Sequence, residues 1–179
     1  PKIIGIIGGM GPEATVDLMQ RIIRLTPAQD DGDHIRCIVD NNPKIPSRIK
    51  AIIDGDGEDP GPVLAEMAQR LEKYGADFLA IPCNTAHHYY NEVAAAVRIP
   101  VLNMAELVAD SIVTHHPGSR RIAVLASPAV RITRLYTPYF KQRGIREIWP
   151  SPDDQDRLFD IIREVKKGET ADKLKRAYS

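Results

Sequence analysis

Short segments rich in isoleucine and valine alternate with longer segments of helical periodicity, and this alternation constrains the fold most. The first apolar segment, Lys-Ile-Ile-Gly-Ile-Ile-Gly over residues 2–8, is typical of a buried strand. A glycine-rich turn and a helix over residues 12–25 follow, and Pro12 suits the first helical position. Repeated strand–helix alternation predicts an α/β fold, with a parallel sheet covered by helices on both faces.

The same pattern continues to the end of the chain, with one break near Asn103. Residues 41–60 are rich in proline, glycine and aspartate, and predict a loop with a short helix near residues 47–53. The remaining pattern predicts strands over 35–40, 78–81, 101–102, 121–125 and 147–149, and helices over 62–74, 85–97, 106–114, 131–143, 153–167 and 170–177. Ligands of such sheets bind where the strands end, so the strand exits are the places to search for a site.

Composition narrows the class of protein. The chain has 24 Lys and Arg against 24 Asp and Glu, so its formal charge is zero. This balance gives no support to nucleic acid or an anionic membrane as a partner. No apolar run approaches the roughly 18 residues of a membrane helix. Cys37 and Cys83 alone make no disulfide scaffold, so we expect a reducing, cytoplasmic location and no membrane.

The glycine-rich turn after the first strand permits three interpretations. Gly9, Gly11 and Ala14 formally satisfy the dinucleotide-binding fingerprint, and Asp40 ends the second strand where a ribose-binding acid would fall. The turn could instead hold a carboxylate on free amides and a helix N-terminus. It could also be a plain strand-to-helix turn that needs glycine for backbone freedom.

The most informative segment is Pro-Cys-Asn-Thr-Ala-His over residues 82–87. Cys83 follows a buried strand and precedes a helix that Asn84 or Thr85 can cap. The positive end of a helix dipole lowers the pKa of a thiol, which can then act as a base, an acid or a nucleophile. Most free cysteines are small buried apolar residues, but the position at a strand exit favours a functional Cys83. Cys37, in the middle of a strand, is expected to be structural.

Other polar residues give weaker indications. Arg48 follows a polar loop, where its guanidinium could hold a carboxylate through two hydrogen bonds, although a solvated surface arginine is commoner. His87–His88 and His115–His116 are adjacent pairs that lack the spacing of a zinc helix, so we expect no metal site. The acidic run over residues 54–59 lacks the spacing of a calcium loop.

Two segments together resemble the aspartate/glutamate racemase family, and within it the aspartate racemase branch. They are residues 5–15, Gly-Ile-Ile-Gly-Gly-Met-Gly-Pro-Glu-Ala-Thr, and residues 82–87. The Asn-Asn-Pro segment leading to Arg48 and the segment around Lys166 also look like that branch. The resemblance implies two similar three-layer α/β domains with parallel sheets and an active site in the cleft between them. We assign the first domain to residues 1–102, which carry Cys83, and the second, incomplete at its C-terminus, to residues 103–179.

The resemblance also implies roles for particular residues. Cys83 would exchange the substrate α-proton without pyridoxal phosphate, metal or any other cofactor. Asn84 and Thr85 would hold the α-carboxylate and amino group, and Met10 would lie on the substrate loop. Positions matching Arg48 and Lys166 are associated with the side-chain carboxylate of aspartate. Ser127 keeps a hydroxyl where the family usually has threonine, whereas Val130 replaces a threonine.

The family's second catalytic cysteine belongs to a Gly-Cys-Thr-Glu-like segment that would follow Ser179. Cys37 lies within a first-domain strand and does not replace it. Inversion needs proton delivery to the opposite face, so we expect the 179-residue form not to racemise aspartate at a useful rate.

These observations predict a cofactor-independent racemase of a dicarboxylic amino acid, with aspartate as the expected substrate and a homodimer as the expected assembly. Three alternatives stay open. The first is a related isomerase resembling maleate isomerase, and the second is an oxidoreductase that binds a dinucleotide. The third is a degenerate racemase fold that serves as a binding module.

Overall fold

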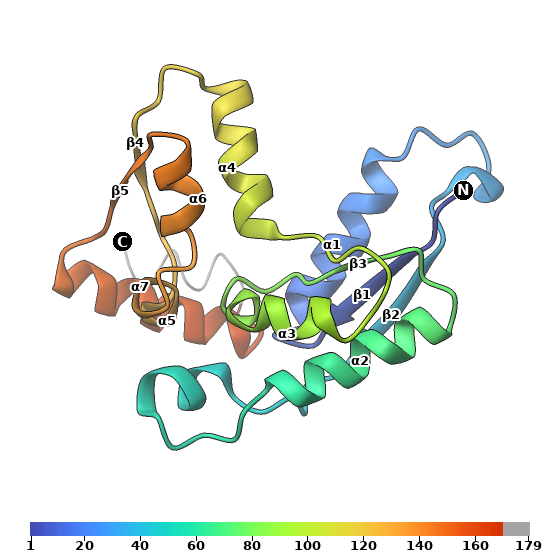
Figure 1. The fold of residues 1–179 in the computed structure, drawn as a ribbon, viewed down its shortest axis with the longest axis horizontal. Helices are drawn as coiled ribbons and strands as arrows, with labels where there is room; N and C mark the ends of the chain where they lie inside the picture. The colour runs from blue at the N-terminus through green and yellow to red at the C-terminus, as the bar shows by residue number, and fades with distance from the viewer. Residues whose placement is uncertain (170–179) are drawn as a thin grey trace. The chain divides into compact units, whose positions relative to one another are not determined.

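A computed structural model describes residues 1–169, and its chain forms two compact units, Pro1–Met104 and a second that begins at Ala105 (Figure 1). The sequence placed the division at residue 102. Each unit has its own hydrophobic core, so the two are described separately. Within the described part of the chain, no helix combines the length and the apolar character needed to cross a membrane.

The first unit is built on a three-stranded parallel sheet. Strand β1 (Ile4–Gly8) lies between β2 (Cys37–Asn41) and β3 (Phe78–Ala80). All of β1 is buried, which explains its continuous isoleucine content. The predicted parallel α/β architecture is therefore confirmed.

Two helices cover this sheet. Helix α1 (Pro12–Leu25) connects β1 to β2, and α2 (Gly61–Lys73) connects β2 to β3. The two connections run in opposite directions along the sheet, so right-handed crossovers place the helices on opposite faces. Figure 1 shows the strands between them. Leu64, Met67 and Leu71 of α2 are fully or almost fully buried in the core.

Some predicted elements of the first unit differ from the structure. The strand expected at residues 101–102 is a single bridge, in which the Leu79 amide donates to the Pro100 carbonyl and the Leu102 amide donates to the Leu79 carbonyl, both at 2.8 Å. The loop after β2 contains a π-helical turn, η2 (Lys50–Asp54). A short 3₁₀ turn, η1 (Asp31–Asp33), precedes β2.

The helix predicted for residues 85–97 is confirmed only in part. The segment forms a 3₁₀ turn, η3 (Thr85–Tyr89), which continues directly into a short α-helix, α3 (Tyr90–Ala95). The His87 amide donates to the Asn84 carbonyl at 3.0 Å, three residues back. The carbonyl four residues back, on Cys83, lies 2.8 Å from His87 Nδ1 instead. The imidazole thus takes the acceptor that an α-helix would use, and the turn tightens.

The second unit has a smaller parallel sheet of β4 (Arg121–Ala123) and β5 (Arg146–Ile148). Helix α4 (Met104–His115) leads into it, and α7 (Pro152–Lys166) follows β5. Ser151 caps α7 by accepting from the Asp154 amide. The core of this unit includes Val130, Phe140 and Ile145.

The helix predicted over residues 131–143 is wrong, because the chain breaks there. It forms α5 (Pro128–Ile132) and α6 (Thr137–Gln142). Pro138 has no amide proton to donate and lies in the first turn of α6, where none is needed, so it suits the start of a new helix and not the interior of a continuous one. Arg134, with φ 51°, turns the chain between the two helices. The helix predicted for residues 170–177 lies outside the described residues.

Candidate active site

The strand exits of the first unit meet at one edge of its sheet. Gly8 pairs with Asn41 and Ile6 with Ala80, so all three strands end on the same side. Met10 and Ile45 are buried in one cluster, against which Cys83 packs. The structure therefore brings together the glycine turn, the cysteine turn and the segment that leads to Arg48.

Cys83 stands on a backbone that is held at both polar groups. Its amide donates to the Ile81 carbonyl at 2.8 Å, and its own carbonyl accepts from His87 Nδ1, also at 2.8 Å. Cys83 is half-buried, Asn84 beside it is exposed, and Thr85 is buried. A half-exposed thiol on a fixed backbone, with a polar amide side chain next to it, suits a group that must meet a substrate.

The sequence predicts that Cys83 precedes a helix whose dipole activates the thiol, and the structure differs at that helix. The turn after Cys83 is η3, a 3₁₀ turn of five residues. Asn84 takes the N-cap position, but in this described segment its side chain makes no capping hydrogen bond. Five residues align few peptide dipoles, so a helix dipole is no basis for thiol activation here.

The importance of His87 is not evident from the sequence, in which the adjacent His87–His88 pair could indicate at most a metal ligand. His87 is 4% exposed, and its Nε2 accepts from the Met104 amide at 3.1 Å. Burial lowers the pKa of His87, and the backbone carbonyls of Cys83 and Leu102 oppose that shift. The available signal was its spacing: four residues after Cys83, an imidazole can reach the cysteine carbonyl.

The glycine turn is explained by backbone packing. Gly9 has φ 96°, and a Cβ there would overlap the backbone of Asn42. The Gly9 amide donates to the buried Thr15 hydroxyl at 3.0 Å. Thr15 therefore occupies a donor that the anion and dinucleotide interpretations both needed, and the amides of Met10 and Gly11 are the candidates that remain.

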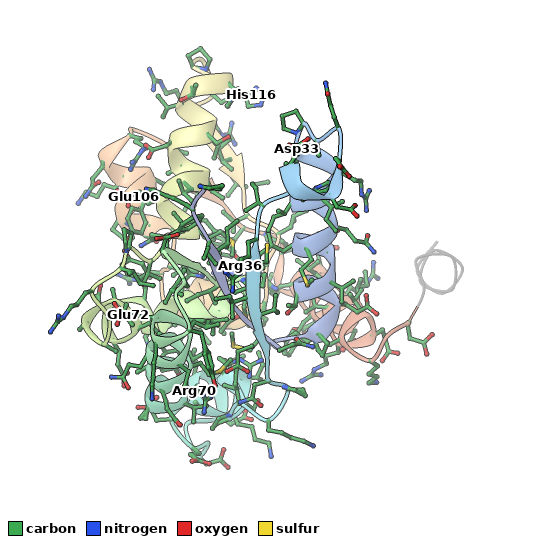
Figure 2. All side chains as sticks on the ribbon, turned by 90° about the vertical axis from the view of Figure 1, so that its right-hand side faces the viewer. Asp33, Arg36, Arg70, Glu72, Glu106 and His116 are labelled. Carbon is green, nitrogen blue, oxygen red and sulfur yellow. The ribbon has the colours of Figure 1, made fainter. Side chains whose placement is uncertain are left out.

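Asp40, the acidic residue that would bind the ribose of a dinucleotide, pairs with another side chain. Asp40 Oδ2 lies 3.3 Å from Nη2 of Arg70, which projects from α2 (Figure 2). The Gly9 amide and the Asp40 carboxylate each have a protein partner, so in this structure neither is free to bind a dinucleotide.

Met10 and Arg48 belong to the segments that meet at the carboxyl edge of the sheet, but their side chains are placed differently. The Met10 side chain is 4% exposed within the core, so only the backbone of this residue can face a substrate. Arg48 Nη1 donates to the carbonyls of Pro46 at 2.9 Å and Ile45 at 3.4 Å. Its Nε is enclosed and has no hydrogen-bond partner among residues 1–169. The positive charge of this guanidinium has no carboxylate partner among the described ion pairs, and a carboxylate ligand would supply one.

Tyr89 is a further neighbour of Arg48 that the sequence did not single out. Burial raises the pKa of Tyr89 most, Asp59 raises it further, and Arg48 opposes the shift. The Arg48 guanidinium is therefore near enough to Tyr89 to favour its ionised form.

The second unit has its own strand exit at Ala126 and Ser127. The Ala126 carbonyl accepts from Gln155 Nε2 at 2.9 Å, and Ser127 is buried at the N-cap of α5. Gln155 is 6% exposed, and its Oε1 has no hydrogen-bond partner in the described chain. Lys166 is exposed at the last residue of α7. The roles of Ser127 and Lys166 stay predictions.

Metal ligands are not gathered in the described residues. No group of three or more His, Cys, Asp and Glu side chains in that part of the chain could hold an ion. The chemistry that the geometry offers is that of a thiol, amides and a guanidinium.

Residues 7–179 match the sequence model of the Asp/Glu/Hydantoin racemase family, and the chain belongs to that family. The predicted family is thereby confirmed.

Individual relatives agree with this assignment. The broad specificity amino-acid racemase RacX of Bacillus subtilis is 30% identical over 169 residues, which cover 92% of this chain and 71% of RacX. The structure is similar to Picrophilus torridus aspartate racemase, with TM-score 0.82 and 34% identity, over 93% of this chain and 68% of that one. This likeness supports the aspartate racemase branch.

A more distant structure shares the fold. The glutamate racemase of Campylobacter jejuni has TM-score 0.60 and 17% identity, over 94% of this chain and 62% of that one. At this identity the likeness concerns the fold alone.

Proposed function

We propose that this protein is an isomerase that racemises a dicarboxylic amino acid, aspartate above all, and that Cys83 is the thiol that exchanges the α-proton. The observation that carries the proposal is the half-exposed Cys83 at the carboxyl edge of the sheet, on a backbone held at 2.8 Å at both its amide and its carbonyl. Neither pyridoxal phosphate nor a metal is part of the proposed reaction.

The difficult step is removal of a weakly acidic α-proton from a zwitterionic amino acid. Negative charge develops on the α-carboxylate, and donors aimed at that oxygen lower the barrier, each by about 3–4 kcal/mol. We assign this role to Asn84, Thr85 and the amides of Met10 and Gly11. Their place beside Cys83, at the ends of parallel strands, supports the assignment.

The contacts of Arg48 support a substrate that carries a second carboxylate group. Its guanidinium is anchored on the carbonyls of residues 45 and 46, and none of the described carboxylates forms an ion pair with it. A planar guanidinium in this state matches a carboxylate ligand. The likeness to an aspartate racemase agrees with this choice, and we place Ser127 and Lys166 among the further substrate-binding residues.

The family resemblance also supports a homodimer. The two free cysteines, Cys37 and Cys83, support a reducing, cytoplasmic location.

The experiment measures exchange of the substrate α-proton in deuterium oxide, a step that needs Cys83 alone, with aspartate, glutamate, alanine and lysine as substrates. We expect aspartate to exchange fastest, Cys83→Ala to abolish the exchange, and Cys37→Ala to leave it unchanged. Equal rates for all four amino acids would overturn the dicarboxylate preference, and would favour the broad specificity that the name of RacX states for that relative.

A further inference from the structure

His87 joins two backbone groups that lie far apart in the sequence. Its Nδ1 is 2.8 Å from the Cys83 carbonyl, and its Nε2 is 3.1 Å from the Met104 amide. The imidazole is 4% exposed, so water does not compete for either contact. One side chain thus fixes the carbonyl of the proposed catalytic cysteine to the first residue of α4.

The two contacts determine the state of the ring. An amide can only donate, so the Met104 contact requires a lone pair on Nε2. The proton of the neutral imidazole then sits on Nδ1, where it is donated to the Cys83 carbonyl. The Leu102 carbonyl also faces the ring, but a ring that carried its proton on Nε2 would lose the Met104 contact.

Each contact fulfils a structural need. The first amides of a helix have no partner within the helix, and His87 supplies one to α4 at Met104. At the other end, Nδ1 replaces the amide that would bond Cys83 in an α-helix. This exchange accompanies the tight η3 turn, which begins two residues after Cys83.

We propose that His87 is a positioning residue of the Cys83 site, and that its Nδ1–H tautomer holds the thiol in place by tying the Cys83 carbonyl to the start of α4. This inference rests on the proposed function for its effect on turnover. The tautomer and the accessibility of the thiol are independent of any activity.

Two substitutions separate the two contacts. In His87→Asn the side-chain amide can replace Nδ1 and donate to the Cys83 carbonyl, whereas in His87→Gln the amide oxygen can replace Nε2 and accept from Met104. We expect His87→Gln to lower kcat about 100-fold with little change in KM, since misplacement of a reacting group by about 1 Å costs this much. His87→Asn should recover most of the rate. His88→Asn, at the exposed neighbour, should behave as wild type.

Two readouts do not depend on turnover. Long-range nitrogen–proton NMR spectra should show a neutral His87 with its proton on Nδ1, and iodoacetamide should label Cys83 at a rate changed by His87→Gln but not by His88→Asn. A proton on Nε2, or His87→Gln with wild-type labelling and kcat, would overturn the positioning role. Wild-type protein that exchanges the α-proton of no amino acid would refute the proposed function, while the tautomer and labelling results would still decide the role of His87.

Discussion

The two units each hold a strand exit by a buried polar side chain, but they do so differently. In the first unit, His87 Nδ1 bonds the Cys83 carbonyl at 2.8 Å and Nε2 receives the Met104 amide. In the second unit, Gln155 Nε2 bonds the Ala126 carbonyl at 2.9 Å, and among the described residues Oε1 has no partner.

The two strand exits differ in whether their stabilising contact is local in the sequence or depends on the packing of a distant element. His87 lies four residues after Cys83, so the contact that fixes the cysteine is local. Gln155 lies 29 residues after Ala126 and reaches it only when α7 has packed. The first exit is therefore formed with its own turn, whereas the second depends on the tertiary structure around Ser127.

The largest effect should come from breaking the backbone packing behind the first exit. Gly9→Ala places a Cβ into the backbone of Asn42 at φ 96°, and we expect the free energy of unfolding to fall by about 4 kcal/mol. Gly75→Ala is the matched control, because Gly75 has φ 94° and open space around it. Urea unfolding should show a loss of only about 1 kcal/mol for Gly75→Ala. Equal losses would mean that the Asn42 contact is unimportant.

A second prediction compares Arg48 of the first unit with Lys166 of the second. Arg48→Ala should weaken binding of a dicarboxylate inhibitor by about 3 kcal/mol and of a monocarboxylate by much less, because a charge-assisted pair is lost. Lys166→Ala, at an exposed position, should cost about 1 kcal/mol or less. Calorimetric titration measures both. A loss that is the same for mono- and dicarboxylates would make Arg48 a structural residue.

Substitution of Gln155 tests what stabilises the strand exit of the second unit. Gln155→Ala should lower the free energy of unfolding by about 2 kcal/mol, because the Ala126 carbonyl loses its buried donor. Gln155→Met removes the unpartnered Oε1 together with the donor and fills the volume, so its loss should be smaller. Thermal unfolding of the two variants provides the comparison, and a more stable Gln155→Ala would show that the hydrogen bond contributes nothing.

The smallest effect is a pH dependence of the first exit. Burial lowers the pKa of His87 below the value of about 6.5 in the unfolded chain. The unfolded state therefore binds more protons below that pH. The stability from neutral His87 is fully present above pH about 6.5 and is lost as the pH falls through the lowered native pKa, by at most about 1.4 kcal/mol per pH unit.

Urea unfolding between pH 5 and 8 checks this dependence. His87→Asn should lose stability less steeply with acid than the wild type. Parallel curves for the two proteins would contradict a neutral, buried His87.

The sequence predicted the parts of the fold that local pattern determines. The isoleucine run of β1 and the proline–glycine boundaries of α1 and α2 agree closely with the structure. The predicted helix over residues 85–97 failed at its start because a side chain, His87, took a backbone acceptor, and hydrophobic periodicity does not report such a contact. The helix over residues 131–143 failed at Pro138, a signal that was present in the sequence.

The candidate site was predictable only in part. Gly9 was expected at a turn, but only the folded structure shows that it packs against Asn42 and that its amide is bonded to Thr15. The bonds that fix Cys83 and Ala126 join groups whose proximity depends on folded geometry. The roles of Met10, Asn84, Thr85, Ser127 and Lys166 in substrate binding stay predictions.

The central claim, that Cys83 exchanges the α-proton, is tested most directly by proton NMR of aspartate in deuterium oxide. The protein should replace the α-proton of aspartate by deuterium, Cys37→Ala should do so at the same rate, and Cys83→Ala should be slower by at least about 100-fold. Exchange by Cys83→Ala at the wild-type rate would contradict the account, because another group would then have to remove the proton.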